Sequence, residues 1–274
     1  MKILILGSTG FIGKNLIERI NQESDLTIQI GNRDLLNPTT SELHEGVVDS
    51  LESSDNRICV INLCGAAGEG NYQRLRVANI DFPLNVLRLV RSTGQELQWL
   101  QASSFFQLYK DLYGQHKDTY SETKDEFLRV LRGEIESSRL QNFYLPHVFG
   151  RYDRPTRLIP RLRSAKREHT NIDLSTGKAV MPLMKVSDLV DELANIGTTW
   201  WTNGSLPMSE NQLLRNGVLT VREIVEIILK EDMNLAKFDQ LPDRPNEFYS
   251  KTDLLGFCGG SKETPFDWPS YLIG

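Results

Sequence analysis

A tyrosine and a lysine four residues apart are the first pair in this sequence whose chemistry suggests an active site. Tyr120 and Lys124 lie in the segment Tyr-Ser-Glu-Thr-Lys, and residues with this spacing share one face of a helix. A lysine cation beside a phenol favours the phenolate and lowers its pKa. Tyr120 is therefore a candidate to give a proton to a carbonyl, or to take one from an alcohol, while a nicotinamide carries the hydride.

Two serines stand earlier in the chain, directly after an apolar run at 98–102. The carboxyl ends of strands in a parallel sheet are where ligands bind, so a hydroxyl there can contact a substrate oxygen. We expect Ser104 to do so. Ser103 is the alternative, because the aromatic residues that follow fit either register, and a helix-capping or turn role is the alternative for both.

A glycine-rich loop, GSTGFIG, places Gly7, Gly10 and Gly13 between an expected strand and an expected helix. In this context one glycine permits a tight turn, one lets a pyrophosphate approach the backbone, and one lets the helix pack on the strand. The helix N-terminus then offers N–H groups and a partial positive charge to phosphates. The loop predicts a dinucleotide site, and a turn that serves packing alone is the alternative.

The segment after the second expected strand bears on the choice between NAD and NADP. Rossmann sites that prefer NAD place an acidic residue here to bind the ribose 2′-hydroxyl. This chain has Asn32 and Arg33, followed by Asp34. Arg33 can pair with a 2′-phosphate, which favours NADP. NAD stays possible, with Asp34 as the residue that binds the ribose. Arg33 could also be a solvated surface residue with no role in cofactor binding.

These residues need a scaffold, and the first 150 residues alternate short apolar strands with helical patterns. This alternation is typical of a parallel sheet covered on both faces. We predict an α/β fold: a Rossmann-type doubly wound parallel sheet with a smaller C-terminal substrate lobe. The expected domains are residues 1–150, which bind the dinucleotide, and residues 151–274, the substrate lobe, interleaved with the first. The expected strands are Lys2–Leu6, Leu26–Ile30, Gly46–Val48, Arg57–Leu63, Gln98–Ala102 and Asn142–Leu145. The expected helices are Phe11–Ile20, Tyr72–Ser92 (interrupted or bent near Pro83), Tyr120–Ser137, Val186–Ile196 and Val221–Lys230.

The composition is that of an ordinary globular protein, with 274 residues, 39% hydrophobic and 24% charged. A net charge of −5 argues against nucleic acid as a partner. No apolar run reaches the roughly 20 residues that cross a bilayer, so no membrane association is expected. Cys59, Cys64 and Cys258 lack metal-ligand spacing, which predicts free thiols, no metal and a cytoplasmic location.

Taken together, GSTGFIG, Ser103–Ser104 and the Tyr120–Lys124 segment resemble the extended short-chain dehydrogenase/reductase family (the NAD-dependent epimerase/dehydratase type), especially its nucleotide-sugar members. Further segments match the family's landmarks in the right order: 62–68, 77–80, 145–154, 158–161, 186–188 and 250–256. Two departures stand out. Tyr109–Lys110 replaces the usual Tyr-Gly, and Met181 stands where the family often has an arginine that holds a nucleotide diphosphate.

The resemblance implies a set of binding residues. Those expected to bind the cofactor are Gly7, Thr9, Gly10, Phe11, Ile12, Gly13, Asn32, Arg33, Asp49, Ser50, Leu63, Cys64, Gly65, Asn79, Tyr120, Lys124, Pro146, His147 and Val148. Those expected to bind substrate are Ser103, Phe105, His147, Arg157, Arg161 and Arg244. The three arginines are candidates because Met181 cannot hold a diphosphate. His147 is more simply a hydrogen-bonded structural residue, with a second proton donor as the alternative.

Within the family, the chain resembles the 4-ketoreductases of nucleotide-linked deoxysugars. The implied activity is an NADPH-dependent reduction of a keto group at C4. Dehydratase relatives carry Asp-Glu where this chain has Phe105–Phe106, which argues against dehydration. The alternatives are a nucleotide-sugar epimerase with tightly held NAD and a non-catalytic dinucleotide sensor. The family also implies a homodimer, formed through the helices around Asn79 and Tyr120.

Overall fold

A computed structural model of the chain describes residues 2–21, 27–30, 57–66, 71–203, 212–213, 215–256 and 267–273. The chain divides into two compact units, one of residues 1–144 and 190–212 and the other of residues 145–189 and 213–274. None of the helices in the described ranges is long and apolar enough to cross a membrane. Each unit has its own sheet and core, so each is treated by itself.

The first unit is built on a six-stranded sheet with the order β2-β1-β3-β4-β5-β9. Its strands are β1 Lys2–Leu6, β2 Thr27–Ile30, β3 Arg57–Asn62, β4 Glu96–Ser104, β5 Leu140–Leu145 and β9 Gln212–Leu213. β1 pairs in parallel with β2 and with β3, and β3 pairs in parallel with β4. The strand order reverses next to β1, and in such sheets ligands bind beyond the carboxyl ends of the strands at this point.

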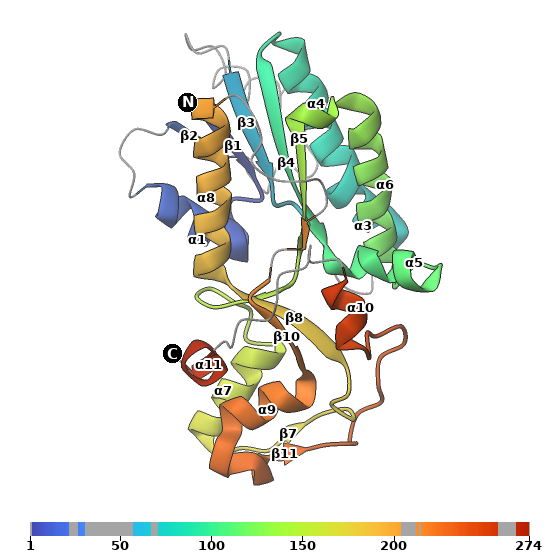
Figure 1. Cartoon of the computed structure of the whole chain (residues 1–274), viewed down its shortest axis with the longest axis vertical. Coiled ribbons are helices and arrows are strands. Elements are labelled where there is room, and N and C mark those ends of the chain that lie inside the picture. Colours follow the sequence, from blue (N-terminus) through green and yellow to red (C-terminus); the bar gives the residue numbers. More distant parts are fainter. Residues whose placement is uncertain are drawn as a thin grey trace. The chain divides into compact units, whose positions relative to one another are not determined.

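Helices cover both faces of this sheet (Figure 1). On one face lie α3 Tyr72–Arg76, α4 Phe82–Ser92 and α6 Thr119–Glu134. On the other face lie α1 Phe11–Ile20 and the part of α8 Val186–Asn203 that belongs to this unit. A buried cluster joins the sheet to the first set of helices, with Trp99 of β4 edge-on to Phe127 of α6 at 6.3 Å between ring centres. Burial of this apolar surface fixes α6 on the sheet.

Two short elements link β4 to α6. A 3-10 turn at Phe105–Gln107 leads directly into α5 Leu108–Tyr113. A second 3-10 turn, Ser137–Arg139, follows α6. Between α3 and α4 the chain makes a π-helical turn over Val77–Asp81. The helix expected at 72–92 is thus interrupted by a π-helical turn, which ends just before α4, and Pro83 stands in the first turn of α4.

The second unit contains a three-stranded sheet of order β10-β8-β6 and a two-stranded pair of β11 with β7. Their bounds are β6 His147–Phe149, β7 Ile172–Asp173, β8 Val180–Lys185, β10 Gly217–Thr220 and β11 Ala236–Lys237. The helical elements are α7 Leu158–Glu168, α9 Val221–Leu229, a 3-10 turn at Lys230–Leu235, α10 Lys251–Leu255 and α11 Trp268–Ile273. The unit has a separate apolar core between α7, α9, α11 and the sheet.

The predicted fold class is confirmed: the chain is mixed α/β with a parallel central sheet of the Rossmann type. The expected strand Gly46–Val48 lies outside the described residues. In the arginine-rich stretch after Gly150, where no helix was expected, α7 forms. Its apolar residues Ile159, Leu162 and Ala165 are buried with helical spacing, and the arginines lie between them.

Candidate active site

The glycine loop joins β1 to α1 in a conformation that only glycine allows at two positions. Gly7 has a φ of +86°, and a Cβ there would lie 3.0 Å from the main chain of Leu63. A Cβ on Gly13 would lie 2.3 Å from the Gly7 oxygen. The first glycine therefore turns the chain tightly beside the loop after β3, and the last lets α1 pack directly on the turn.

The N-terminus of α1 is arranged to receive an anion. Gly10 is the N-cap residue and has no side chain to cap the helix, and the first turn contains no acidic residue. Main-chain N–H groups and the positive end of the helix dipole at such a position favour phosphate. Thr9, in the turn before the helix, is exposed. These residues fit a dinucleotide pyrophosphate.

The loop after β3 is the second wall of the site. The Leu63 N–H donates to the Leu6 oxygen at 2.9 Å, so this loop stays beside the glycine loop. The Cys64 N–H donates to Asn62 Oδ1 at 3.0 Å, and Asn62 Nδ2 donates to Gln101 Oε1 at 2.9 Å. Asn62 is buried and shapes the turn from inside the sheet. Its side chain was not among the predicted site residues, although it opens the Asn62–Gly68 segment.

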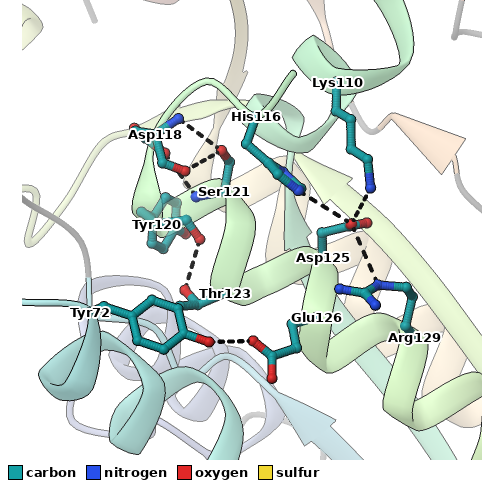
Figure 2. A network of polar contacts seen from close by, with 10 residues as sticks. All are labelled: Tyr72, Lys110, His116, Asp118, Tyr120, Ser121, Thr123, Asp125, Glu126 and Arg129. Carbon is teal, nitrogen blue, oxygen red and sulfur yellow. Dashed lines mark hydrogen bonds and ion pairs between the residues drawn. The ribbon is translucent and has the colours of Figure 1, made fainter. Parts of the chain in front are cut away.

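Tyr120 and Lys124 stand in the first part of α6, as their spacing predicted. The helix begins with a capping box in which Asp118 accepts from the Ser121 N–H at 2.8 Å, and the Asp118 N–H donates to Ser121 Oγ (Figure 2). This box fixes where α6 begins, and therefore where the tyrosine and lysine side chains leave the helix.

Lys124 is almost fully buried, and its ammonium reaches the ends of two strands. Nζ donates to the Cys64 oxygen at 2.6 Å and to the Ala102 oxygen at 3.2 Å. Burial lowers the pKa of Lys124 to about 8, and the nearby Cys64 opposes the shift in part. Near neutral pH the ammonium is therefore charged, yet close to losing its proton.

Gly65 is the residue that both side chains approach. A Cβ on Gly65 would lie 3.3 Å from Lys124 Nζ and 3.8 Å from the Tyr120 hydroxyl oxygen. The phenol and the ammonium thus converge on the loop after β3, beside the ends of β3 and β4. Proton transfer to a carbonyl requires a hydroxyl positioned in this way, within hydrogen-bond reach of the carbonyl oxygen.

Asn79, in the π-helical turn, holds the same loop from the other side. Its Oδ1 accepts from the Ala66 N–H at 2.9 Å, and its Nδ2 donates to the Ala66 oxygen at 3.2 Å and to Thr123 Oγ1 at 2.9 Å. Such π-helical turns are rare, and they occur frequently at functional sites. The predicted Asn79 and the unpredicted Thr123 are therefore brought together with Ala66.

The two serines at the end of β4 have different partners. The Ser103 hydroxyl donates to Asn142 Oδ1 at 2.6 Å, in the interior of the sheet. Ser104 Oγ accepts from the Phe106 N–H at 3.3 Å, and the Ser104 N–H donates to Gln107 Oε1 at 2.8 Å. None of the described residues accepts the Ser104 hydroxyl proton. Ser104 therefore caps the 3-10 turn and keeps a proton to donate.

Two phenylalanines follow the serines. The Phe105 and Phe106 rings lie 4.4 Å apart between centres, with Phe105 buried and Phe106 half-buried. The ammonium of Lys117 lies 4.6 Å from the centre of the Phe106 ring. This apolar pair presents no carboxylate beside Ser104.

The remaining described candidates belong to the second unit. Pro146 and Val148 are buried, and His147, which begins β6, is half-buried. Arg157 Nη1 donates to the Val148 oxygen at 2.7 Å and to Asp153 Oδ1 at 2.9 Å, so its charge is partly used within the unit. Arg244 is exposed.

Arg161 lines a polar pocket of about 370 Å³ in the second unit. The other lining residues are Pro155, Ser164, Ala165, Thr170, Asn171, Ile172 and Asp173.

Four of the predicted cofactor residues, Asn32, Arg33, Asp49 and Ser50, lie outside the described residues, as does Asp34. The structure thus brings together the glycine loop, the loop after β3, the end of β4 and the Tyr120–Lys124 pair, all within the first unit.

A parallel α/β sheet with a glycine loop at β1 and a tyrosine–lysine pair beside the carboxyl ends of β3 and β4 defines a short-chain dehydrogenase/reductase scaffold. The model of the NAD dependent epimerase/dehydratase family matches residues 3–197. The chain belongs to this family, and is an NAD(P)-dependent enzyme of the extended short-chain dehydrogenase/reductase type. The family resemblance is confirmed.

Curated relatives act on nucleotide sugars. The chain is 21% identical to the CDP-abequose synthase of Salmonella muenchen over 278 residues, which is 96% of this chain and 93% of that protein. It is 28% identical to a UDP-2-acetamido-2,6-beta-L-arabino-hexul-4-ose reductase of Pseudomonas aeruginosa over 155 residues, 57% of this chain and 38% of that protein. The structure of a dTDP-glucose 4,6-dehydratase of Bacillus anthracis in complex with NAD is similar in fold. The TM-score is 0.71 at 17% identity, over 99% of this chain and 94% of that one.

Proposed function

We propose that the protein is an NADPH-dependent reductase of a keto group, at C4, on a nucleotide-linked deoxysugar. The observation that carries the proposal is the convergence of the Tyr120 hydroxyl and the Lys124 ammonium on Gly65, next to the end of β4. This arrangement can donate a proton to a carbonyl oxygen from one defined direction. The two curated relatives described above bear the names of nucleotide-sugar enzymes, and one name specifies reduction of a hexul-4-ose.

Each side chain has a distinct task in this reaction. The nicotinamide, when bound, supplies the hydride. Tyr120 donates its hydroxyl proton to the substrate oxygen as negative charge develops there. The Lys124 ammonium favours the phenolate that remains, because a cation close to a phenol lowers its pKa. Ser104 donates a hydrogen bond to the substrate oxygen, through the hydroxyl proton that no described residue accepts, and so polarises the carbonyl without losing its proton.

The hydrogen-bond partners of the two serines favour Ser104 over Ser103 as the residue that contacts the substrate oxygen. The Ser103 proton is already given to Asn142, in the interior of the sheet. Phe105 and Phe106 occupy the positions after Ser104, where dehydration would need an acid–base pair, and a phenylalanine ring cannot move a proton. Reduction therefore suits this end of β4 better than dehydration does.

We assign the cofactor to the first unit and the nucleotide sugar largely to the second. The residues that would hold the dinucleotide are Gly7, Thr9, Gly10, Phe11, Ile12, Gly13, Leu63, Cys64, Gly65, Asn79, Tyr120 and Lys124. Pro146, His147 and Val148 are further candidates for binding the cofactor. Arg33, with Asn32, would bind the 2′-phosphate that distinguishes NADPH. The arginines Arg157, Arg161 and Arg244 would pair with the diphosphate of the substrate, and Arg161 already lines a pocket. A homodimer is part of the proposal.

The test is consumption of NADPH with a panel of 4-keto-6-deoxy nucleotide sugars, with NADH in parallel. We expect turnover that favours NADPH and falls by about 10²–10⁴-fold in Tyr120→Phe. Arg33→Ala should then weaken NADPH binding and leave NADH binding unchanged. Consumption of neither cofactor, with NAD held by the purified protein, would instead favour the epimerase. Cofactor binding without turnover of any sugar would favour the dinucleotide sensor.

A further inference from the structure

Thr123 lies between Tyr120 and Lys124 on α6 and is fully buried. Its hydroxyl donates to the Tyr120 main-chain oxygen at 2.9 Å (Figure 2). A buried threonine in a helix commonly satisfies its hydroxyl in this way, and such a bond alone indicates no function. Thr123 differs because its oxygen also accepts a hydrogen bond from outside the helix, from Asn79 Nδ2 at 2.9 Å.

The orientation of the Asn79 amide follows from its partners. The Ala66 N–H is a donor only, so it must face the oxygen of the amide, Oδ1. The amide nitrogen then has two protons, one for the Ala66 oxygen at 3.2 Å and one for Thr123 Oγ1. The threonine hydroxyl can accept from Asn79 because its own proton is given to Tyr120. Thr123 thus accepts the second amide proton and holds Asn79 in the orientation that the Ala66 N–H requires.

The consequence falls on the loop after β3, which is held at three successive residues. Lys124 Nζ binds the Cys64 oxygen, Gly65 lies against Lys124 and Tyr120, and Asn79 binds both main-chain groups of Ala66. Two of these three contacts come from α6, and the third reaches α6 through Thr123. Further out, Glu126 of α6 accepts from the Tyr72 hydroxyl at 2.6 Å (Figure 2). It also accepts from Arg76 at 3.1 Å, and so joins α3 to α6.

We propose that Thr123 is a positioning residue. By holding Asn79 in place, it sets the position of the Gly65 loop relative to the Tyr120 hydroxyl and the Lys124 ammonium. Its side chain has no exposed surface, so its effect on the loop is transmitted through Asn79. The proposal that this loop lies against a bound cofactor rests on the proposed function. The hydrogen bonds that join Thr123, Asn79 and Ala66 are observed in the structure and do not depend on that function.

The test compares Thr123→Val, which keeps the shape and removes the hydroxyl, with Thr123→Ser, which keeps the hydroxyl. We expect Thr123→Val to speed hydrogen exchange at the Ala66 amide by about tenfold, to weaken NADPH binding and to lower kcat by a similar factor. Its basic pH limit of activity should also move, because Lys124 and Gly65 no longer hold their spacing. Thr123→Ser should restore all four quantities.

Thr93→Val is the matched control. The Thr93 hydroxyl donates to the Val90 oxygen at 2.7 Å, the same local bond three residues back, at the end of α4 and without a link to the loop. It should leave Ala66 exchange and kinetics unchanged. If Thr123→Val misfolds, Asn79→Asp serves as the second variant. It keeps the acceptor for the Ala66 N–H and loses the donors to Thr123 and to the Ala66 oxygen.

Wild-type Ala66 exchange and NADPH affinity in Thr123→Val would overturn the proposal. So would a failure of Thr123→Ser to restore them, because the methyl packing would then be what matters. Should the wild type reduce none of the sugars, the proposed function fails. The Ala66 exchange would still decide the role of Thr123.

Discussion

The ammonium of Lys124 donates to the main-chain oxygen of Cys64 at 2.6 Å, so a side chain of α6 is bonded directly to the loop after β3. The same ammonium also binds the Ala102 oxygen near the end of β4. One buried cation thus joins the two strand ends that form the edge of the site. Its protonation state should affect both the chemistry and the loop.

Activity should fall as the pH rises through about 8. Burial disfavours the ammonium, so the pKa of Lys124 lies near 8, below the usual value of about 10.4. The cation is therefore present below this pH and is lost above it, and with the cation goes the support for the phenolate. A pH profile of kcat/KM for the reduction measures this limit. In Lys124→Arg, whose guanidinium keeps its proton, the limit should move upward, and an unmoved limit would assign it to another group.

Gly65→Ala should lower kcat/KM by about tenfold or more. The new methyl group would lie 3.3 Å from Lys124 Nζ, and two carbonyls hold that ammonium in place. Pushing the ammonium away separates it from Tyr120, and a small misplacement of this kind can cost much of a rate. Steady-state kinetics and cofactor titration measure the effect.

Gly133→Ala in α6 is the control for that substitution. Nothing lies within 4 Å of a Cβ there, and alanine favours a helix over glycine by up to about 1 kcal/mol. Kinetics should stay unchanged and stability should rise slightly. Equal kinetic losses in both variants would show that the contact at Gly65 is not responsible.

Ser103→Ala and Ser104→Ala should separate stability from catalysis. The Ser103 hydroxyl binds Asn142 in the interior, so its loss removes a buried hydrogen bond and should cost about 0.5–1.5 kcal/mol of stability. Ser104→Ala removes the donor proposed for the substrate oxygen, which should cost about 10²–10³-fold in kcat. Chemical denaturation and kinetics on both variants give the two answers. If Ser103→Ala lowers kcat more than Ser104→Ala does, Ser103 and not Ser104 is the residue that contacts the substrate oxygen.

Several features of the site could be predicted because they depend on the spacing of residues that are close together in the sequence. The glycine loop, the Tyr120–Lys124 pair and β1 with α1 depend on residues close together in the chain, and β1 and α1 occur with the expected bounds. The expected strand at 98–102 is longer, Glu96–Ser104, because Ser103 and Ser104 continue the ladder without being apolar. Polar residues at strand ends carry no period that would reveal this.

Other features depend on contacts between distant segments. The Asn79–Thr123 bond joins positions 44 residues apart, and the Lys124–Cys64 bond joins positions 60 apart. No pattern within a window of sequence indicates either bond. Thr123 stands directly before Lys124 in the sequence, but no neighbouring residue distinguishes it from an ordinary helix residue that faces the core. Likewise, α7 was missed because its arginines obscured three buried apolar positions.

Replacing Gln98 should stabilise the protein. Gln98 lies in β4 with no exposed surface, and neither its Oε1 nor its Nε2 has a hydrogen-bond partner among the described residues. Buried amide groups without partners cost free energy that an apolar side chain of similar length avoids. Gln98→Met should therefore raise the free energy of unfolding by about 1–3 kcal/mol, measured by urea denaturation.

Gln101→Met, three residues along the same strand, should have the opposite effect. Gln101 Oε1 accepts from Asn62 Nδ2 at 2.9 Å and from Trp99 Nε1 at 3.1 Å. Its loss leaves two buried donors unpaired and releases Asn62, which shapes the turn before Gly65. Stability and cofactor affinity should fall together. Both variants replace a glutamine of the same strand by methionine. If the free energy of unfolding rises in Gln98→Met and falls in Gln101→Met, the hydrogen-bond partners of a buried glutamine, and not its polarity, decide its effect on stability. A change of the same sign in both variants would contradict this.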